Sequence, residues 1–120
     1  MYGYIGKVLL VNLTDKSYVI EDLPEEWARD YLGGVTLGAR YLYRLMKTHT
    51  PAFAPESVLG MVCGVTGGSK SLMGARVYVV SKSPVNDLWN DSSCGGSFAP
   101  HLRASGFDAI FITGKSEKPC

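Results

Sequence analysis

The chain has 120 residues, of which 46% are hydrophobic and 19% are charged, and its formal net charge is +1. This size suits one domain with a real core. The composition is typical of a soluble globular protein, and the small net charge gives no reason to expect nucleic acid or an anionic membrane as a partner. The sequence contains no run of about 18 apolar residues and no secretory signal pattern, so we expect a cytoplasmic protein without a membrane span.

The first half of the chain predicts a β-hairpin followed by two helices. Residues 4–13 and 17–23 are rich in β-forming residues and are separated by turn chemistry. Pro24 is expected to open a helix whose acidic first turn suits its positive end, and Gly33 is expected to stop it. Apolar residues at helical spacing then predict a second helix that reaches about Lys47.

The second half predicts three strands and a short helix. Residues 57–63 form an apolar strand, and a glycine-rich loop leads to a second strand at 75–82. Residues 85–96 are expected to be irregular. Ser97 is a candidate N-cap for a short helix that reaches Ala104, and residues 107–113 form the last strand.

The order ββααββαβ favours an α+β fold over a doubly wound sheet. We expect one domain, residues 1–120, with mixed or antiparallel sheets and a few short helices. Seven apolar strand residues are expected to be buried together in one core. They are Val8, Leu10, Val62, Val77, Val79, Ile110 and Ile112.

The cysteines and histidines show no metal or disulfide pattern. Cys63, Cys94 and Cys120 are far apart and form no C-x-x-C pair, so Cys63 and Cys120 are interpreted as buried or incidental thiols. His49 and His101 have neither triad nor metal spacing and are interpreted as structural or solvent-exposed residues.

Two glycine-rich stretches approach known nucleotide motifs without matching them. Residues 64–71 nearly spell a phosphate-binding Walker A loop, but Ser69 replaces the final glycine and a strand pattern follows where the motif needs a helix. Residues 33–38 lie between two predicted helices and not after a strand. A helix–helix junction is one interpretation of them, and glycines that approach a cofactor are the other.

Arg76 and the glycine-opened loop that contains Cys94, Gly95 and Gly96 are the strongest candidate site. An arginine offers a planar fork of donors that suits phosphate. Adjacent glycines let backbone N–H groups approach a ligand at the start of a helix. An ordinary surface arginine is the alternative, but its flanks in the sequence indicate that Arg76 is held in place. The pattern indicates an anionic, phosphate-bearing cofactor.

At these residues the chain resembles the N-terminal domain of the aldehyde:ferredoxin oxidoreductase family, enzymes with a tungsten bis-pyranopterin cofactor. The resemblance runs from end to end, and its specificity comes from the ordered set of short segments. They include Tyr2-Gly3, Val11-Asn12-Leu13-Thr14, Tyr31-Leu32-Gly33-Gly34, Arg76 with Val79-Val80, Lys82-Ser83-Pro84, Gly95-Gly96 with Phe98, and Gly106-Phe107-Asp108-Ala109-Ile110.

The resemblance implies a β-rich base on which the pterins lie. Arg76 would contact the cofactor, as would the loop of Ser93, Cys94, Gly95 and Gly96, partly through backbone groups. A magnesium ion bridges the two pterin phosphates in the family, which implies a backbone contact at Ser93. Tungsten, or molybdenum, is held by cofactor sulfurs and not by protein cysteines.

The chain also departs from the family pattern. Ser93 stands where asparagine is common, and Val35 or Thr36 stands where an arginine often follows the first double glycine. The family's iron–sulfur cysteines and catalytic acid–base groups have no counterpart in these 120 residues. We therefore expect a fragment or split piece of an aldehyde-oxidising enzyme. Its expected partners are the remainder of the oxidoreductase and, for the complete enzyme, ferredoxin. The sequence leaves open whether the chain also forms homo-oligomers. The alternative is a non-catalytic scaffold or interaction domain that keeps the fold without the cofactor.

Overall fold

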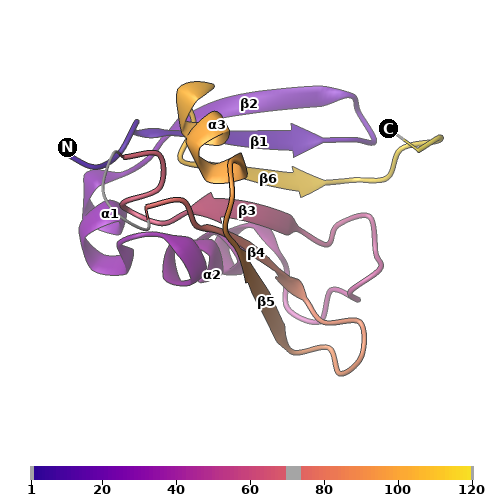
Figure 1. Cartoon of the computed structure of the whole chain (residues 1–120). Coiled ribbons are helices and arrows are strands. Elements are labelled where there is room, and N and C mark those ends of the chain that lie inside the picture. Colours follow the sequence, from indigo (N-terminus) through magenta and orange to yellow (C-terminus); the bar gives the residue numbers. More distant parts are fainter. Residues whose placement is uncertain (1, 70–73, 120) are drawn as a thin grey trace.

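The structure is a computed structural model that describes residues 2–69 and 74–119 (Figure 1). In this part of the chain, six strands form one mixed sheet in the order β2-β1-β6-β3-β4-β5. β1 and β6 pair in parallel, and the other neighbours pair antiparallel. The α+β fold predicted from the sequence is confirmed. The strands are β1 (Lys7–Asn12), β2 (Ser17–Asp22), β3 (Leu59–Cys63), β4 (Val77–Lys82), β5 (Trp89–Cys94) and β6 (Ala109–Thr113), and the helices are α1 (Glu25–Tyr31), α2 (Gly34–Leu45) and α3 (Phe98–Ala104).

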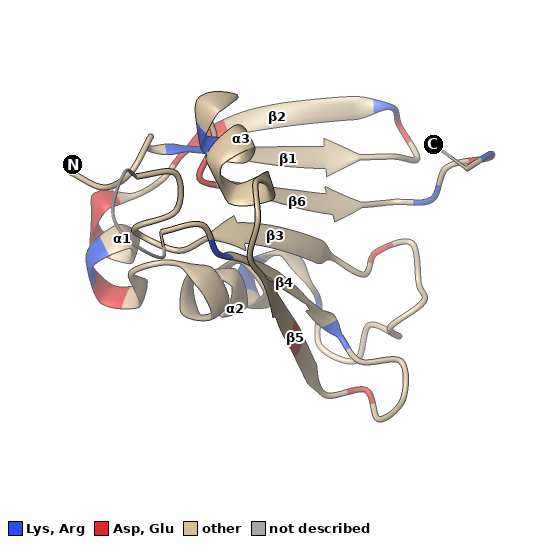
Figure 2. Cartoon of the chain, in the orientation of Figure 1, with Lys and Arg blue, Asp and Glu red and all other residues tan. Residues whose placement is uncertain are grey.

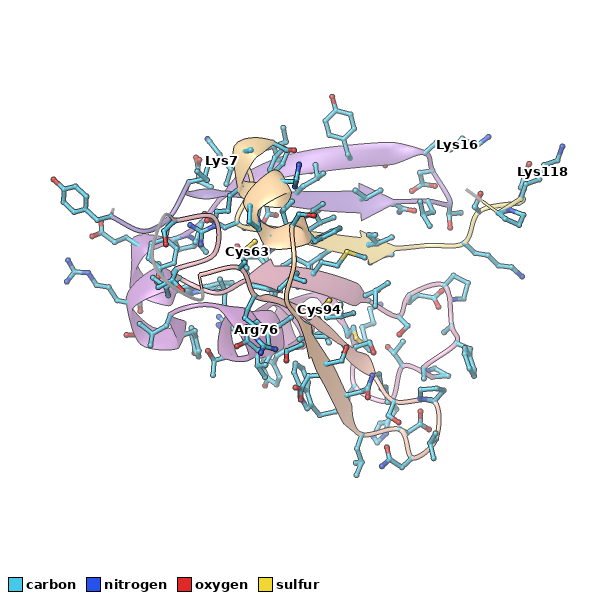
Figure 3. The ribbon with its side chains drawn as sticks, viewed as in Figure 1. Lys7, Lys16, Cys63, Arg76, Cys94 and Lys118 are labelled. Carbon is cyan, nitrogen blue, oxygen red and sulfur yellow. The ribbon has the colours of Figure 1, made fainter. Side chains whose placement is uncertain are left out.

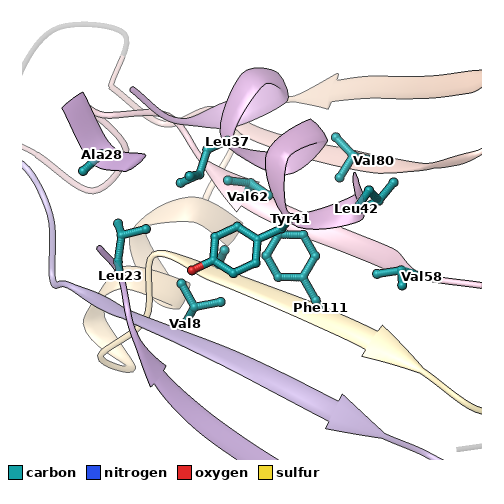
Figure 4. Packing of buried hydrophobic residues seen from close by; sticks show 11 residues of the cluster. Val8, Leu23, Ala28, Leu37, Tyr41, Leu42, Val58, Val62, Val80 and Phe111 are labelled. Carbon is teal, nitrogen blue, oxygen red and sulfur yellow. The ribbon is translucent and has the colours of Figure 1, made fainter. Parts of the chain in front are cut away.

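The helices cover the two faces of the sheet unequally. α2 packs on β3 and β4, with α1 beside it, and α3 lies on the other face against β3 (Figure 1). The larger hydrophobic cluster lies under α1 and α2 and includes Val8, Tyr41, Val62, Val80 and Phe111 (Figure 4). A smaller cluster under α3 contains Cys63, Val77, Ala99 and Leu102.

The prediction of one core is therefore wrong in detail. Successive side chains of a strand point to opposite faces, and each face of this sheet has its own helical cover. Val8 and Val62 are buried in the larger cluster and Val77 in the smaller one. The other four predicted core residues, Leu10, Val79, Ile110 and Ile112, are half-buried.

Two glycines let α2 lie close to the sheet. A Cβ atom added at Gly38 would lie 2.9 Å from Cγ2 of Val80, and one added at Gly60 would lie 2.6 Å from Cε1 of Phe111. Neither position has room for a side chain. The ring of Tyr41 stacks on Phe111 at 4.7 Å between centroids, so the large aromatic residues fill the space beside the two glycines.

In the second half, one local prediction is wrong and another is confirmed in position. Trp89–Cys94, predicted to be irregular, forms β5, which pairs with β4 at the edge of the sheet and is exposed along its whole length. Ser97 is the N-cap residue of α3, as predicted, but its side chain makes no cap hydrogen bond, and its backbone is helical with φ −91° and ψ −7°. Its carbonyl instead accepts the N–H of His101 at 3.1 Å.

The junction between α1 and α2 agrees with the helix–helix interpretation of Gly33 and Gly34. α1 ends at Tyr31, Leu32 has a positive φ of 58°, and α2 starts at Gly34 with φ 59°. Backbone of this kind favours glycine. In the described part of the chain, no helix has the length and apolar character needed to cross a bilayer.

Candidate functional site

The β4–β5 hairpin brings Arg76 and Ser93 together. Arg76 directly precedes β4, and Ser93 lies on β5 opposite Tyr78. The Nη1 atom of Arg76 donates to Oγ of Ser93 at 3.2 Å. Both residues are exposed. The hydrogen bond orients the guanidinium group, whose other donors have no hydrogen-bond partner among the described residues and can meet a ligand. Figure 3 shows Arg76 near the start of β4, on the side of the sheet that carries α2.

The loop between β5 and α3 contains the other predicted site residues. Cys94 pairs with Val77, and its thiol donates to the carbonyl of Gly95 at 3.1 Å. Gly96 has φ 91°, a backbone conformation that favours glycine whatever atoms surround it. Added Cβ atoms at Gly95 and Gly96 would meet no atom within 4 Å. Arg76 therefore hydrogen-bonds to Ser93, and the two glycines border open space.

A glycine-lined hollow adjoins Arg76. It has a volume of about 270 Å³, and its lining includes Gly33, Gly34, Gly64 and Tyr78. The Tyr78 ring lies against Gly34, where an added Cβ atom would be 2.8 Å from Cδ2. The carbonyl of Arg76 accepts the N–H of Gly64 at 3.3 Å. The first double glycine, the glycine-rich loop and Arg76 thus meet at one end of the sheet.

A buried ion pair supports this end of the fold. Nε of Arg103 on α3 lies 3.1 Å from Oδ1 of Asp108, and the two side chains are only 10% and 2% exposed. Asp108 also accepts the N–H groups of Ile5 and Gly6, at 3.1 and 2.6 Å. Arg103 donates to the carbonyl of Gly64 at 3.0 Å. The pair therefore ties α3 to the start of β1 and to the glycine-rich loop.

This ion pair was not predicted from the sequence, although the sequence contains one signal for it. Asp108 interrupts an apolar strand pattern between Phe107 and Ala109. A buried carboxylate needs a partner or several donors, and the fold supplies both. Arg103 gave no comparable signal, because a basic residue in the last turn of a helix is common.

The structure describes Cys63, Cys94 and both histidines. Cys63 is buried, and its burial raises the pKa of the thiol, with the nearby Arg103 acting in the opposite direction. His101 on α3 lies with Nδ1 2.6 Å from the carbonyl of Ser97. Cys120, and Lys70 and Ser71 of the Walker-like stretch, lie outside the described residues. Within residues 2–69 and 74–119, no group of three or more His, Cys, Asp or Glu side chains could hold a metal ion.

Comparison with known proteins gives a consistent set of matches. The family model of the aldehyde ferredoxin oxidoreductase N-terminal domain matches residues 8–120. The tungsten-containing aldehyde ferredoxin oxidoreductase of Pyrococcus abyssi is 37% identical over 119 residues, which are 99% of this chain and 20% of the relative. The aliphatic sulfonate oxidoreductase, WOR-like subunit, of Pyrococcus furiosus is 30% identical over 122 residues, 99% of this chain and 19% of the relative.

A solved structure agrees with these relatives. The BamBC active-site complex of benzoyl coenzyme A reductase, bound to 1,5-dienoyl-CoA, superposes with a TM-score of 0.94 at 32% identity, over 98% of this chain and 18% of that chain. The chain therefore spans about a fifth of the length of the relatives that it matches. With a family model that covers nearly all of its residues, this chain belongs to the aldehyde ferredoxin oxidoreductase family, whose N-terminal domain it matches.

Proposed function

We propose that residues 1–120 are the cofactor-supporting N-terminal domain of a tungsten pterin oxidoreductase. The observation that carries this proposal is the Arg76–Ser93 hydrogen bond beside the open Gly95–Gly96 loop. Relatives from Pyrococcus abyssi and Thermococcus kodakarensis are named as tungsten-containing enzymes. Molybdenum in the same kind of cofactor is the alternative metal.

The residues present fit a phosphate-bearing pterin. The guanidinium group of Arg76 has five N–H donors, and Ser93 uses one of them. Gly95 has neither a positive φ nor a neighbour that would exclude a side chain. Among the residues that the structure describes, none requires glycine there, whereas a ligand lying directly on the backbone would. The site therefore suits a bulky anion that contacts both the guanidinium group and the loop.

Each site residue has a defined part in this proposal. Arg76 binds a pterin phosphate or a polar pterin edge, and Ser93 positions the guanidinium group. The backbone carbonyl of Ser93 would hold a magnesium ion that accompanies the cofactor, and the backbone of Cys94, Gly95 and Gly96 would lie against the pterin. The cofactor supplies two-electron redox chemistry at a metal held by its own sulfurs, so this domain needs no cysteine ligands for the metal.

The proposed reaction of the complete enzyme follows from the family. An aldehyde and water give a carboxylic acid, two protons and two electrons, and the electrons pass through an iron–sulfur cluster to ferredoxin. The cluster ligands and the catalytic acid–base groups belong to the remainder of the oxidoreductase. One matched relative is named for aliphatic sulfonates, which supports the view that the substrate is selected outside the matched fifth of the enzyme.

The proposal is tested by replacing Arg76 in the complete oxidoreductase. A charge-assisted contact of this kind contributes roughly 1.5–3 kcal/mol, so Arg76→Ala is expected to weaken cofactor retention roughly 10- to 150-fold. Arg76→Lys should recover only part of the loss, because lysine keeps the charge but not the fork. Arg29→Ala is the matched control, since Arg29 is an exposed arginine on α1 whose ion pair with Glu25 is also exposed.

The measurements are tungsten, molybdenum and pterin content per protein, together with thermal unfolding of the cofactor-free form. Cofactor retention by Arg76→Ala equal to that of the control would show that the site assignment is wrong. An unfolded apoprotein would show that Arg76 is structural. If the unsubstituted protein, made in a tungsten-supplied host, contains no metal and no pterin, the scaffold alternative is correct.

A further inference from the structure

The face of the sheet that carries α3 is apolar far beyond α3. Strand register aligns apolar side chains on this face in two rows that cross the sheet. The first row consists of Ile20, Leu9, Ile110, Met61 and Val79. The second row consists of Tyr18, Val11, Ile112 and Leu59. These nine residues are here called the open face.

α3 covers only one end of the open face. Met61 and Ile110 pack against the cluster under α3, and this helix contacts β3. Figure 1 shows α3 at the end of the sheet where β1 and β6 begin and β3 ends. Farther along, Tyr18 is 69% exposed, Ile20 is 49% exposed and Leu59 is 38% exposed. Figure 2 shows the middle of β1, β6 and β3 without charged residues, which gather at the ends of the strands and on the helices.

A solvated face of a sheet normally carries polar side chains, so that apolar and polar residues alternate along each strand. Here β1, β4 and β6 have apolar residues on both faces. That pattern is typical of strands buried on both sides. A contiguous apolar patch of this kind on a soluble protein marks a contact surface.

We propose that the open face is the docking surface for the rest of the oxidoreductase, in the same chain or as a separate subunit. The matched relatives are about five times longer than this chain. Because the matching model is that of an N-terminal domain, the remainder follows on the C-terminal side. In this fold the segment after β6 leaves the sheet beside the open face, where Ser116 helps to line a hollow of about 430 Å³ with Leu9, Val11 and Tyr18.

The chemistry of the face defines the partner surface. The partner surface is expected to be uncharged at its centre and rich in aliphatic and aromatic side chains that can fill the hollow beside Tyr18. The inference rests on family membership and not on cofactor binding, because Arg76 and Ser93 lie toward the opposite face with Tyr78. Loss of docking and loss of cofactor contact can therefore be separated by experiment.

Cross-linking in the complete oxidoreductase tests the proposal. The photo-reactive residue p-benzoylphenylalanine replaces either Tyr18 or Val19, and cross-linked peptides are identified by mass spectrometry. Val19 is a matched control, because it is a neighbour on β2, is 57% exposed and points to the other face. Position 18 is expected to cross-link to peptides of the oxidoreductase outside residues 1–120, and position 19 is not.

A double substitution provides an independent measurement. Tyr18→Lys with Ile20→Lys places two charges on the open face, and because both side chains are exposed, the domain itself should still fold. We expect this variant to lower the melting temperature of the complete protein, or to release the separate subunit, with unchanged behaviour for Val19→Lys. The proposal is wrong if position 18 cross-links only to another copy of residues 1–120, if neither position cross-links, or if the two lysine variants behave alike.

Discussion

Tyr41 is the largest fully buried side chain of the domain, and among the described residues its hydroxyl has no hydrogen-bond partner. The ring stacks on Phe111 and meets Trp27 edge-on, at 5.2 Å between centroids. Burial raises the pKa of Tyr41 to about 12, although the positive charge of Arg44 acts in the opposite direction. The ring therefore stabilises the core, whereas the hydroxyl adds an unsatisfied polar group.

Tyr41→Phe separates these two contributions. The variant keeps the ring contacts and removes a buried unpaired hydroxyl, so its free energy of unfolding at pH 7 should be unchanged or higher by about 1 kcal/mol. Urea unfolding monitored by circular dichroism measures this difference. A loss of more than about 1 kcal/mol would reveal a hydrogen-bond partner for the hydroxyl.

The same variant, Tyr41→Phe, is expected to change how the free energy of unfolding depends on pH in the alkaline range. The pKa of Tyr41 is about 12 in the folded state and about 10 in an unfolded chain. The protonated form is favoured by folding, so this contribution to stability is complete below pH 10 and is lost as the pH rises toward 12. Tyr41→Phe should therefore lose less stability than the parent between these pH values. Equal losses would contradict the assignment, since the other tyrosines titrate in both proteins.

At the scale of elements, β4 separates the two layers of the core. Val80 is fully buried in the larger cluster under α2, whereas its neighbour Val79 is half-buried on the open face. Val80→Asp buries an unpaired charge and should prevent folding. Val79→Asp keeps partial access to water and should leave a folded domain of lower stability. Circular dichroism and thermal unfolding of both variants give the comparison, and equal effects would contradict the two-layer assignment.

The helices and strands also show how much of the fold can be predicted from the sequence. Strands with clear alternation, such as β4, and helices with apolar spacing, such as α2, were predicted in their places. β5 was missed because Trp-Asn-Asp-Ser-Ser-Cys contains residues that are depleted in strands, and only its pairing with β4 holds it extended. The division into two clusters was missed because alternation identifies the faces of a strand but not the helix that covers each face.

The candidate site, too, could be predicted only in part from the sequence. Arg76 and the glycine-opened loop could be singled out from residue chemistry, but their relation could not. The hydrogen bond from Arg76 to Ser93 depends on the β4–β5 hairpin, whose second strand the sequence did not reveal. The Arg103–Asp108 pair joins a helix to the start of a strand through contacts with Ile5 and Gly64, so only the tertiary fold brings its parts together.

At the scale of the whole molecule, the chain spans about a fifth of the length of the relatives that it matches. In the part of the chain that the structure describes, no acidic, histidine and cysteine side chains gather into a metal-binding group. The described histidines, His49 and His101, are both exposed. The apolar open face and the open Gly95–Gly96 loop both have room for further contacts. In the proposed function, the cofactor and the remainder of the oxidoreductase make these contacts.

The isolated 120-residue chain should accordingly fold but show no oxidation of aldehydes with viologen dyes, even after incubation with tungstate and pterin cofactor. The reason is that the proposed function assigns the groups for electron transfer and for proton transfer to the remainder of the oxidoreductase, and this chain matches only a fifth of the relative's length. Activity is measured as dye reduction under anaerobic conditions, with the complete oxidoreductase as the positive control. Sustained turnover by the purified chain would overturn the assignment of this domain as a support for the cofactor, because catalysis would then need only residues within 1–120.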